Sequence, residues 1–588
     1  MLTLPNHGPL AQRPLSRSAL LALGLLLGCH AAHAEGGGKG PTPHPSTPTA
    51  ATPGKSRAAK KPLGPAAPKP RAHVKANLTS PLGTNLDGIN DWSSDFPFVD
   101  ALKRSRAWIS STDSQWEDQR KFTLDERGFP RSLAEGQRAR TLIWWDLPHY
   151  PAGDYVVLYE GVGRLSYAPQ GDVREKRAGR ELVHVDPKKG FFSLIIEAIP
   201  KPESYLKNVH VIMPGGVCED DPVRYCDDAH PCAGRAACTS FEQNYETQIF
   251  HPKFLERLQK FSVVRFMDWM RTNESSERKW ADRPLPTDVR FRDGVPVETM
   301  VALANRLSQH PWFNMPHAAD DDYVRRFATY VRDNLRPDLK AYVEYSNEVW
   351  NGIFPQSGYA TEQGKKLGLG QSNWDAQYRF QARRSTEVQK IWESVFQGQE
   401  KRLVRVLGTQ VANEGVAEAL LSFEDTSQHV DALAVAPYFG GEYGAPEEAK
   451  RWESATITQI IDDLRARSLP TSFKFIKRHA EIAKKYRLEL VAYEGGESFA
   501  GIAGSENNDK LNKLFDAVGR DPRMKQIYLE YLAGWRDNGG RLFVHFTDCF
   551  VPGKFGRWGA LEYLEQPRAE APKFDALLTF IEQNPRWW

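Results

Sequence analysis

The spacing of apolar residues changes along the chain. From about residue 107 to 214, apolar and polar residues alternate over short runs broken by Gly and Pro. Such alternation indicates half-buried antiparallel strands joined by tight turns, as in a small sandwich. From about residue 250 onward, short apolar runs alternate with stretches whose apolar residues recur at helical spacing. That rhythm indicates strands that alternate with helices.

Eight segments have the character of barrel strands. They are 82–89, 262–269, 311–316, 341–348, 402–409, 431–438, 488–495 and 541–548. Strands that alternate with helices pair in parallel, and eight of them can close into a (β/α)8 or TIM barrel. An open doubly wound sheet is the alternative, but it usually has a Gly-rich phosphate turn after its first strand, and LGTNLDGIND lacks one. We therefore predict an α/β fold, a TIM barrel with an inserted antiparallel β-sandwich.

The first 34 residues have the pattern of an export signal. Arg13 and Arg17 precede a short apolar run, Ala19–Leu27, and Ala32-His33-Ala34 fits a cleavage site. A buried helix is the alternative. The run is too short to cross a bilayer, which takes about 20 residues, so we expect no integral membrane segment in the mature protein.

The residues Leu26-Leu27-Gly28-Cys29 also resemble a bacterial lipoprotein cleavage box, which would put a lipid anchor on Cys29. Residues 35–76 are rich in Gly, Pro, Ala, Thr and Lys without apolar periodicity, which predicts a solvated linker. We expect a protein that is secreted or held in the periplasm or cell envelope of a bacterium.

Charge is distributed unevenly over the 588 residues. The first 76 contain ten Lys and Arg and one acidic residue, whereas the remainder contains 67 basic and 73 acidic residues. The folded body is therefore mildly acidic, which argues against nucleic acid as a partner.

Four of the six cysteines, Cys218, Cys226, Cys232 and Cys238, crowd one segment. In an exported protein they predict two disulfides, with three possible connectivities. A zinc site is the alternative, but the segment has no C-x-x-C pair, and nothing in its acidic residues fixes a calcium site. We expect Cys549 to be a buried free thiol.

These patterns divide the chain into six parts. They are a signal peptide at 1–34, a linker at 35–76, the first strand and helix of the barrel at 77–106, the sandwich at 107–214, a Cys-rich loop at 215–245 and the remainder of the barrel at 246–588.

Two strand ends present a glutamate in similar surroundings. In AYVEYSNEVWN (341–351) a strand runs into Asn347-Glu348, and in LELVAYEGGES (488–498) a strand runs into Glu494 and two glycines. In a barrel, active sites lie at the carboxyl ends of the strands. Two carboxyl groups facing each other there are what glycoside chemistry requires. Glu344 and Glu497 lie near them, and we expect Glu344 to be a structural hydrogen-bonding residue.

The order of these motifs resembles the clan of retaining (β/α)8 glycoside hydrolases that includes cellulases, mannanases and β-xylosidases. The likeness covers about residues 82–106 and 250–565. It implies that Glu348, after Asn347 at the end of strand four, is the acid/base, and that Glu494, at the end of strand seven, is the nucleophile. One departure is Val349, where many members of the clan have Pro.

The resemblance also implies roles for neighbouring residues. Arg265 matches a basic residue on strand two, Tyr438 a strand-six tyrosine that contacts the nucleophile, and Trp558 a strand-eight sugar platform. A cation and a hydroxyl near Glu494 would hold that carboxyl ionised. Asn347 is placed to hydrogen-bond the sugar 2-hydroxyl.

Further candidates lie at or just beyond other strands, where Trp rings can offer flat apolar faces to sugars. They are Trp92, Trp269, Trp312 and Trp350, with Asn314, His317 and Asp91 as polar candidates. In the predicted sandwich, Trp144, Trp145 and Tyr159 can bind carbohydrate or form its core, and the core is the simpler expectation.

We therefore expect a monomeric, secreted, retaining glycoside hydrolase that cleaves β-linked polysaccharide at internal bonds, without cofactor or metal. The sequence contains no H-E-x-x-H or G-x-S-x-G motif. Two alternatives stay open. One is a non-catalytic polysaccharide-binding or matrix protein on the same fold, and the other is a transglycosylase.

Overall fold

The computed structural model describes residues 77–169 and 172–588. The predicted signal peptide, Cys29 and the linker of residues 35–76 lie outside this range. Within the described residues, no helix is both long and apolar enough to cross a membrane.

The centre of the molecule is a closed barrel of parallel strands, which confirms the predicted fold class. Its strands in order are β1 (Leu82–Asn85), β13 (Val263–Arg265), β14 (His310–Met315), β15 (Ala341–Tyr345), β16 (Leu403–Gly408), β17 (Ala432–Val435), β18 (Glu489–Ala492) and β19 (Phe543–His545). Strand β1 closes the ring, because Thr84 pairs with Val264 on one side and with His545 on the other. Each segment predicted to be a barrel strand contains one of these strands or, at β14, all but its first residue.

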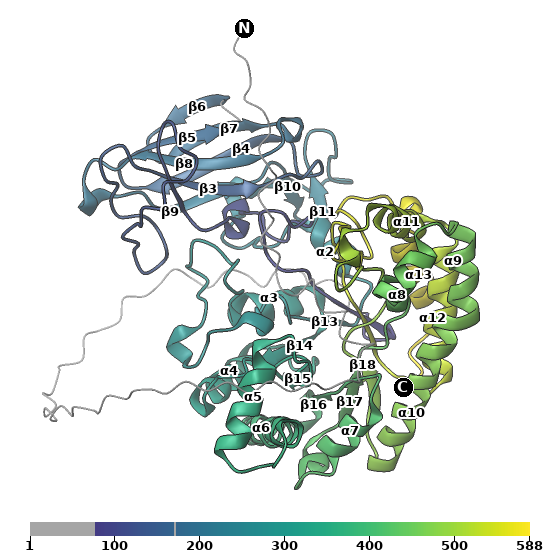
Figure 1. Cartoon of the computed structure of the whole chain (residues 1–588). Helices are drawn as coiled ribbons and strands as arrows, with labels where there is room; N and C mark the ends of the chain where they lie inside the picture. Colours follow the sequence, from purple (N-terminus) through teal and green to yellow (C-terminus); the bar gives the residue numbers. More distant parts are fainter. Residues whose placement is uncertain (1–76, 170–171) are drawn as a thin grey trace, which may run out of the picture.

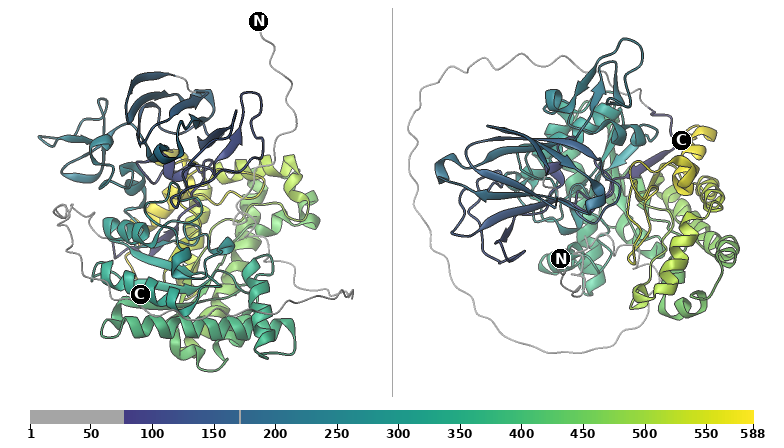
Figure 2. Two further views of the ribbon diagram at one scale, coloured as in Figure 1. Left: turned by 90° about the vertical axis from the view of Figure 1, so that its left-hand side faces the viewer. Right: turned by 90° about the horizontal axis from the view of Figure 1, so that it is seen from above.

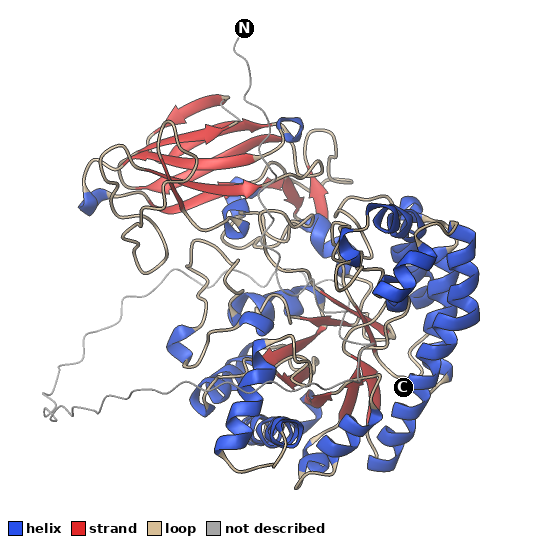
Figure 3. Ribbon diagram, in the orientation of Figure 1, coloured by secondary structure: helices blue, strands red, loops and turns tan. Residues whose placement is uncertain are grey.

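Helices surround the barrel (blue in Figure 3). The described helices are α1 (Phe241–Asn244), α2 (Pro252–Leu258), α3 (Val297–Leu307), α4 (Asp321–Asn334), α5 (Pro355–Lys366), α6 (Asn373–Val395), α7 (Glu414–Leu421), α8 (Pro446–Trp452), α9 (Ile457–Asp463), α10 (Leu469–Tyr486), α11 (Asp509–Arg520), α12 (Met524–Asp537) and α13 (Pro572–Gln583). Helix α4 shows how the sequence specifies them. The Asp320 carboxylate accepts a hydrogen bond from the Tyr323 backbone N–H. Asp321 and Asp322 lie in the first turn, where the positive end of the helix dipole stabilises their negative charges.

The interior of the barrel is apolar except at the carboxyl ends of the strands, where it is polar. Val263, Trp312, Tyr342, Val491 and their neighbours form a buried cluster inside the ring, and the Trp312 and Tyr342 rings stack with centroids 5.5 Å apart. Side chains from alternate strands fill a barrel of this size completely. The polar groups of the interior therefore gather at the carboxyl ends of the strands.

A β-sandwich is inserted between β1 and α2. One sheet has the order β2 (Ile109–Ser111), β3 (Arg138–Trp144), β8 (Phe192–Ala198) and β5 (Arg164–Ala168), and the other β6 (Val173–Arg177), β7 (Arg180–Val185), β4 (Gly153–Glu160) and β9 (Lys207–Ile212). Figures 1 and 2 show the sandwich beside one end of the barrel. Because the insertion follows the carboxyl end of β1, it belongs to the face where barrel enzymes place their sites.

The sandwich shares a core with the barrel. Trp144 and Phe192 from the sandwich and Phe98 and Trp269 from the barrel side belong to one cluster of buried residues. The Phe98 and Trp269 rings lie with centroids 5.6 Å apart. The insertion is therefore packed against the barrel.

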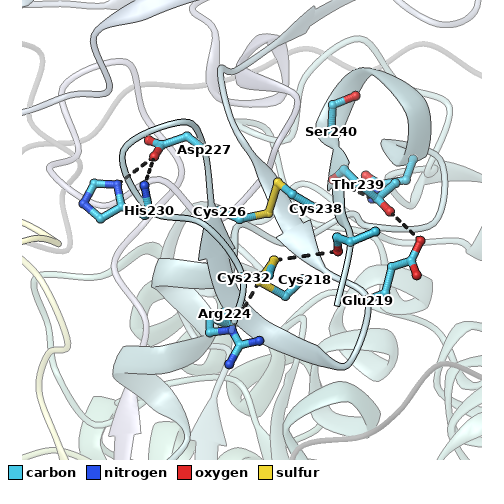
Figure 4. Close-up of a disulfide and its surroundings, with 12 residues drawn as sticks. Cys218, Glu219, Arg224, Cys226, Asp227, His230, Cys232, Cys238, Thr239 and Ser240 are labelled. Atoms are coloured by element: carbon cyan, nitrogen blue, oxygen red, sulfur yellow. Dashed lines mark hydrogen bonds and ion pairs between the residues drawn. A yellow bond between two sulfur atoms is a disulfide. The ribbon is translucent and has the colours of Figure 1, made fainter. Parts of the chain in front are cut away.

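Two disulfides staple the segment after the sandwich, as predicted. This segment forms a small sheet of order β11 (Asp221–Cys226), β10 (Gly216–Cys218) and β12 (Cys238–Ser240). Of the three possible connectivities, the structure has Cys218–Cys232 and Cys226–Cys238 (Figure 4). The remaining described cysteine, Cys549, is buried and free, as expected.

The connectivity can be tested directly. We expect peptide mapping of the non-reduced protein to find Cys218 joined to Cys232, and Cys226 joined to Cys238. These pairs close short loops. In the chain-entropy model, a disulfide that closes a loop of about 15 residues stabilises the folded protein by about 3 kcal/mol. Reduced and alkylated protein is the control. Peptides that join Cys218 to Cys226 or to Cys238 would contradict the pairing.

Candidate active site

The chain turns sharply after β15 and points Glu348 inward. Ser346 and Glu348 adopt left-handed backbone conformations, with φ of 58° and 40°, which cost roughly 1–2 kcal/mol for a residue with a side chain. Two hydrogen bonds fix the turn. The Ser346 N–H donates to the Met315 carbonyl at 2.8 Å, and the Asn314 amide donates to the Ser346 carbonyl at 2.8 Å. Strain held by its surroundings is common at functional sites.

Glu348 is buried and hydrogen-bonded by two neutral donors. The Tyr493 hydroxyl donates to its Oε1 at 2.7 Å, and the Asn351 amide donates to its Oε2 at 2.9 Å. Burial, together with the negative charge of Glu494, raises the pKa of Glu348 to about 8. Glu348 therefore keeps its proton at neutral pH.

Glu494 is also buried but has a cation beside it. Arg265 Nη1 donates to its Oε1 at 2.9 Å, and the Tyr438 hydroxyl donates to its Oε2 at 3.0 Å. Burial raises the pKa of Glu494 to about 7, while Arg265 opposes the shift and the charge of Asp268 adds to it. Because a direct guanidinium partner stabilises a carboxylate, Glu494 loses its proton at lower pH than Glu348.

Arg265 connects the strand ends. Its guanidinium is fully buried and donates at 2.9–3.1 Å to Asn85, Glu494, Glu344 and Asn347. These four acceptors come from strands β1 and β15 and from the loops after β15 and β18. A buried charge is tolerated only when it is paired and hydrogen-bonded in this way.

Glu344 has the structural role predicted for it. Its Oε2 accepts from Arg265 Nη2 at 2.9 Å, Trp312 Nε1 at 3.0 Å and the Asn314 amide at 2.8 Å. Gly408 on the neighbouring strand makes room for its other oxygen, since a Cβ there would lie 2.6 Å from Oε1. Glu344 therefore fixes Asn314, which holds the turn before Glu348, and Arg265, which contacts Glu494.

Asn347 is held from both ends of its amide. Its Oδ1 accepts from Arg265 at 2.9 Å and its Nδ2 donates to Asn273 Oδ1 at 3.1 Å. The Gln356 amide donates to the same Asn273 oxygen and to the Asn347 carbonyl, both at 2.7 Å. The residue before Glu348 is thus held rigidly next to the two glutamates.

Most of the predicted polar residues meet here. The structure brings Arg265, Asn347 and Tyr438 to the two glutamates, and Asn314 joins them through Glu344. The sequence analysis did not identify Tyr493, Asn351 and Asn85, nor Asn273 and Gln356, which hold Asn347. Asn351 had a local signal, because a residue three positions after Glu348 can lie on the same turn. Tyr493 stood in an apolar run, where it was indistinguishable from core.

The predicted tryptophans behave differently. Trp558 is 1% exposed and packs with Met267, Phe354 and Phe546 in a cluster that Tyr438 also contacts. It lies beside the site but is covered.

Trp269 and Trp350 lie in the hydrophobic core instead of on an open rim. The Trp269 ring packs against Phe254 and Phe266, and Trp350 belongs to a buried cluster with Leu407. Both residues follow strands, which is why they were expected to face the sugar-binding cleft, but their side chains pack into the hydrophobic core.

The remaining candidates lie in the surrounding loops. His317 packs its ring edge-on against Tyr359, and burial lowers its pKa. Asp91 forms an ion pair with Arg106 at 2.7 Å. Trp92 is half-buried beneath the guanidinium groups of Arg106 and Arg292.

A polar cavity lies near β13 at the junction of the barrel and the sandwich. It has a volume of about 460 Å³ and is lined by Asp125–Gly128 of the sandwich segment and by barrel-loop residues including Arg271, Glu274 and Asp288. Arg271 and Glu274 also line a small hollow with Asp268 and Asn273, and the charge of Asp268 acts on Glu494. The cavity and the hollow thus share the lining residues Arg271 and Glu274.

Glu344 provides a test of this architecture. Glu344→Ala leaves the donors of Arg265, Trp312 and Asn314 buried without their acceptor. We expect a loss of roughly 3–5 kcal/mol in the free energy of unfolding, measured by urea denaturation. Glu344→Gln keeps an acceptor oxygen and is the matched control, with a smaller loss. A Glu344→Ala protein within about 1 kcal/mol of wild type would contradict the role given to Glu344.

No protein-family model matches the chain, and no curated protein matches it. Among solved structures, the chain is similar to a fungal β-1,4-galactanase (11% identity, TM-score 0.31, 56% of this chain and 91% of that one) and a Bacteroidetes-affiliated cellulase (12%, 0.34, 56% and 84%). It is also similar to an endo-1,4-β-D-mannanase from Thermotoga petrophila (12%, 0.32, 56% and 94%).

Proposed function

We propose that this protein is a retaining glycoside hydrolase that cleaves β-linked polysaccharide. The observation that carries the proposal is the contrast between two buried glutamates at the carboxyl ends of β15 and β18. Glu348 is hydrogen-bonded by neutral donors, and Glu494 by a guanidinium group and a hydroxyl. Two carboxyl groups with different environments are suited to separate acid and nucleophile roles.

In the first step Glu348 gives its proton to the glycosidic oxygen. A Glu494 oxygen forms a bond to the anomeric carbon as the bond to the leaving oxygen breaks. Arg265 and Tyr438 keep Glu494 ionised before attack, and both donors remain near the carboxyl after it becomes an ester. The negative charge of Glu494 is lost in this step, so Glu348 becomes a stronger acid as its proton is transferred.

In the second step Glu348 acts as a base. It removes a proton from water, whose oxygen attacks the anomeric carbon and displaces Glu494 as a carboxylate. The proton returns to Glu348 and the charge to Glu494, so both groups end as they began. An acceptor sugar in place of water would give transglycosylation instead. Cleavage at internal bonds stays a prediction.

We also propose that the protein works outside the cytoplasm. Two disulfides in one short segment support this, because such bonds persist in oxidising compartments. The predicted signal peptide agrees with that location. A lipid anchor on Cys29 and a monomeric state remain predictions.

Substitution of the two glutamates tests the assignment. We expect Glu494→Ala to abolish release of reducing ends from β-glucans, xylans, mannans, galactans or bacterial exopolysaccharides. Glu348→Ala should lower polymer cleavage by about 10²–10⁴-fold, with a smaller effect on formation of the glycosyl-enzyme from a dinitrophenyl glycoside, whose leaving group needs no proton.

Glu489→Ala is the control, because Glu489 lies exposed at the opposite end of β18. Its activity should equal that of wild type. Activity in Glu494→Ala equal to wild type would rule out Glu494 as the nucleophile. A wild-type protein that binds a polymer of the panel without cleaving it would favour the non-catalytic alternative.

The pH dependence of kcat/KM tests the protonation states. We expect a bell-shaped pH profile. Its acidic limb should lie near the pKa of Glu494, about 7, and its alkaline limb near the pKa of Glu348, about 8. The Tyr493 hydroxyl stabilises ionised Glu348, so Tyr493→Phe should raise that pKa and move the alkaline limb to higher pH.

Tyr438→Phe is the matched variant. The Tyr438 hydroxyl stabilises ionised Glu494, so its loss should move the acidic limb to higher pH. A Tyr493→Phe protein in which only the acidic limb moves would reverse the assignment of acid and nucleophile.

A further inference from the structure

Two aromatic side chains emerge from the outer face of the sandwich at one end of a sheet. Trp144 of β3 pairs with Phe192 of β8, and both are buried with no exposed surface. Side chains alternate between the faces of a sheet. The next residues, Trp145 and Phe191, therefore point away from the core. Their rings lie with centroids 5.4 Å apart, and both are only half-buried.

A third ring extends this pair. Trp116, in the segment between β2 and β3, lies 6.2 Å from Trp145 and 5.7 Å from Phe191 between centroids. The Arg140 guanidinium lies 4.1 Å from the Trp116 ring centroid. Trp116 nevertheless remains 43% exposed, which is unusual for so large an apolar side chain. Aromatic surface left in water beside other exposed rings marks a binding surface more often than an isolated ring does.

The three rings continue toward the barrel. The Arg106 guanidinium lies 5.7 Å from the ring centroids of both Trp145 and Trp92. The Trp145 backbone N–H also donates to the Asp91 carbonyl at 2.9 Å, which fixes the sandwich to the loop after β1. We name Trp92, Trp116, Trp145 and Phe191 the aromatic strip.

The aromatic strip lies on the same face of the barrel as the glutamates. Trp92 belongs to the loop that follows the carboxyl end of β1, and Gly88, Ile89 and Asn90 of that loop line the hollow with Asp268. Asn85, the last residue of β1, accepts a hydrogen bond from Arg265, which also contacts Glu494. One continuous run of chain therefore leads from the catalytic residues to the strip.

We propose that the aromatic strip binds a β-linked polysaccharide chain that extends out of the active site onto the sandwich. The inference rests on the proposed glycosidase function for its direction of approach. Pyranose rings in such a chain present flat C–H faces, which pack on Trp and Phe rings, while arginines beside the rings donate to hydroxyl groups. The strip would hold the polymer while Glu348 and Glu494 act on one of its bonds.

The test measures binding without cleavage. Native gels containing barley β-glucan, xylan, glucomannan, galactan or hydroxyethylcellulose are run with Glu494→Gln protein, and α-linked dextran is the control polymer. We expect at least one β-linked polymer to retard the protein. Adding Trp116→Ala and Trp145→Ala should raise the dissociation constant roughly tenfold or more, since each ring contact contributes to affinity.

Trp374→Ala is the matched control. Trp374 is 61% exposed on α6 and its nearest ring contact is Tyr378, outside the strip. Its removal should leave retardation unchanged, and the single variant Trp116→Ala, at an exposed position, guards against unfolding of the double variant. Circular dichroism and melting temperature check that each variant is folded.

Two results would overturn the proposal. One is retardation by none of the β-linked polymers, and the other is equal binding by the folded Trp116→Ala/Trp145→Ala protein. Neither result depends on hydrolysis. Failure of the proposed function would give a different result. A β-linked polymer would retard the protein and the double variant would lose this retardation, but the wild type would release no reducing ends.

Discussion

A single buried guanidinium group organises the carboxyl ends of the barrel strands. Arg265 has no exposed surface, and removing a cation from water costs several kcal/mol unless its partners are well placed. Those partners are Glu344, Glu494, Asn347 and Asn85. They come from β1, β15 and the loops after β15 and β18. The position of the proposed nucleophile is therefore set by the same contacts that hold the strands together.

This arrangement explains which features could be predicted from the sequence. Apolar runs that alternate with amphipathic helices marked all eight barrel strands, because a parallel strand buried on both faces needs such a run. Glu348 and Glu494 were recognisable because a carboxylate directly after a buried strand lies at the functional edge of the barrel. The Arg265 and Tyr438 assignments depended on resemblance, and the structure places both beside Glu494.

Side-chain direction beyond the strand ends could not be predicted. Trp269 and Trp350 follow strands just as Trp92 does, but only Trp92 remains half-exposed. A one-dimensional pattern does not show which neighbours will cover a ring. The same limit hid Tyr493, whose hydroxyl reaches a carboxyl that lies 145 residues away in the sequence. The disulfide connectivity was likewise undetermined, since cysteine spacing permits three pairings.

Closure of the ring by β1 has a consequence for how the protein folds. The Asn85 side chain accepts from Arg265, 180 residues away, and donates to the His545 carbonyl, 460 residues away. Contacts at such long range form slowly, because the entropy of bringing distant segments together is lost before the contacts compensate for it. The first strand must wait for nearly the whole chain to be synthesised before both its edges are paired. Until then its unpaired backbone is an open template for other chains. Yield of the native protein therefore depends on how well the first strand is protected during synthesis and folding.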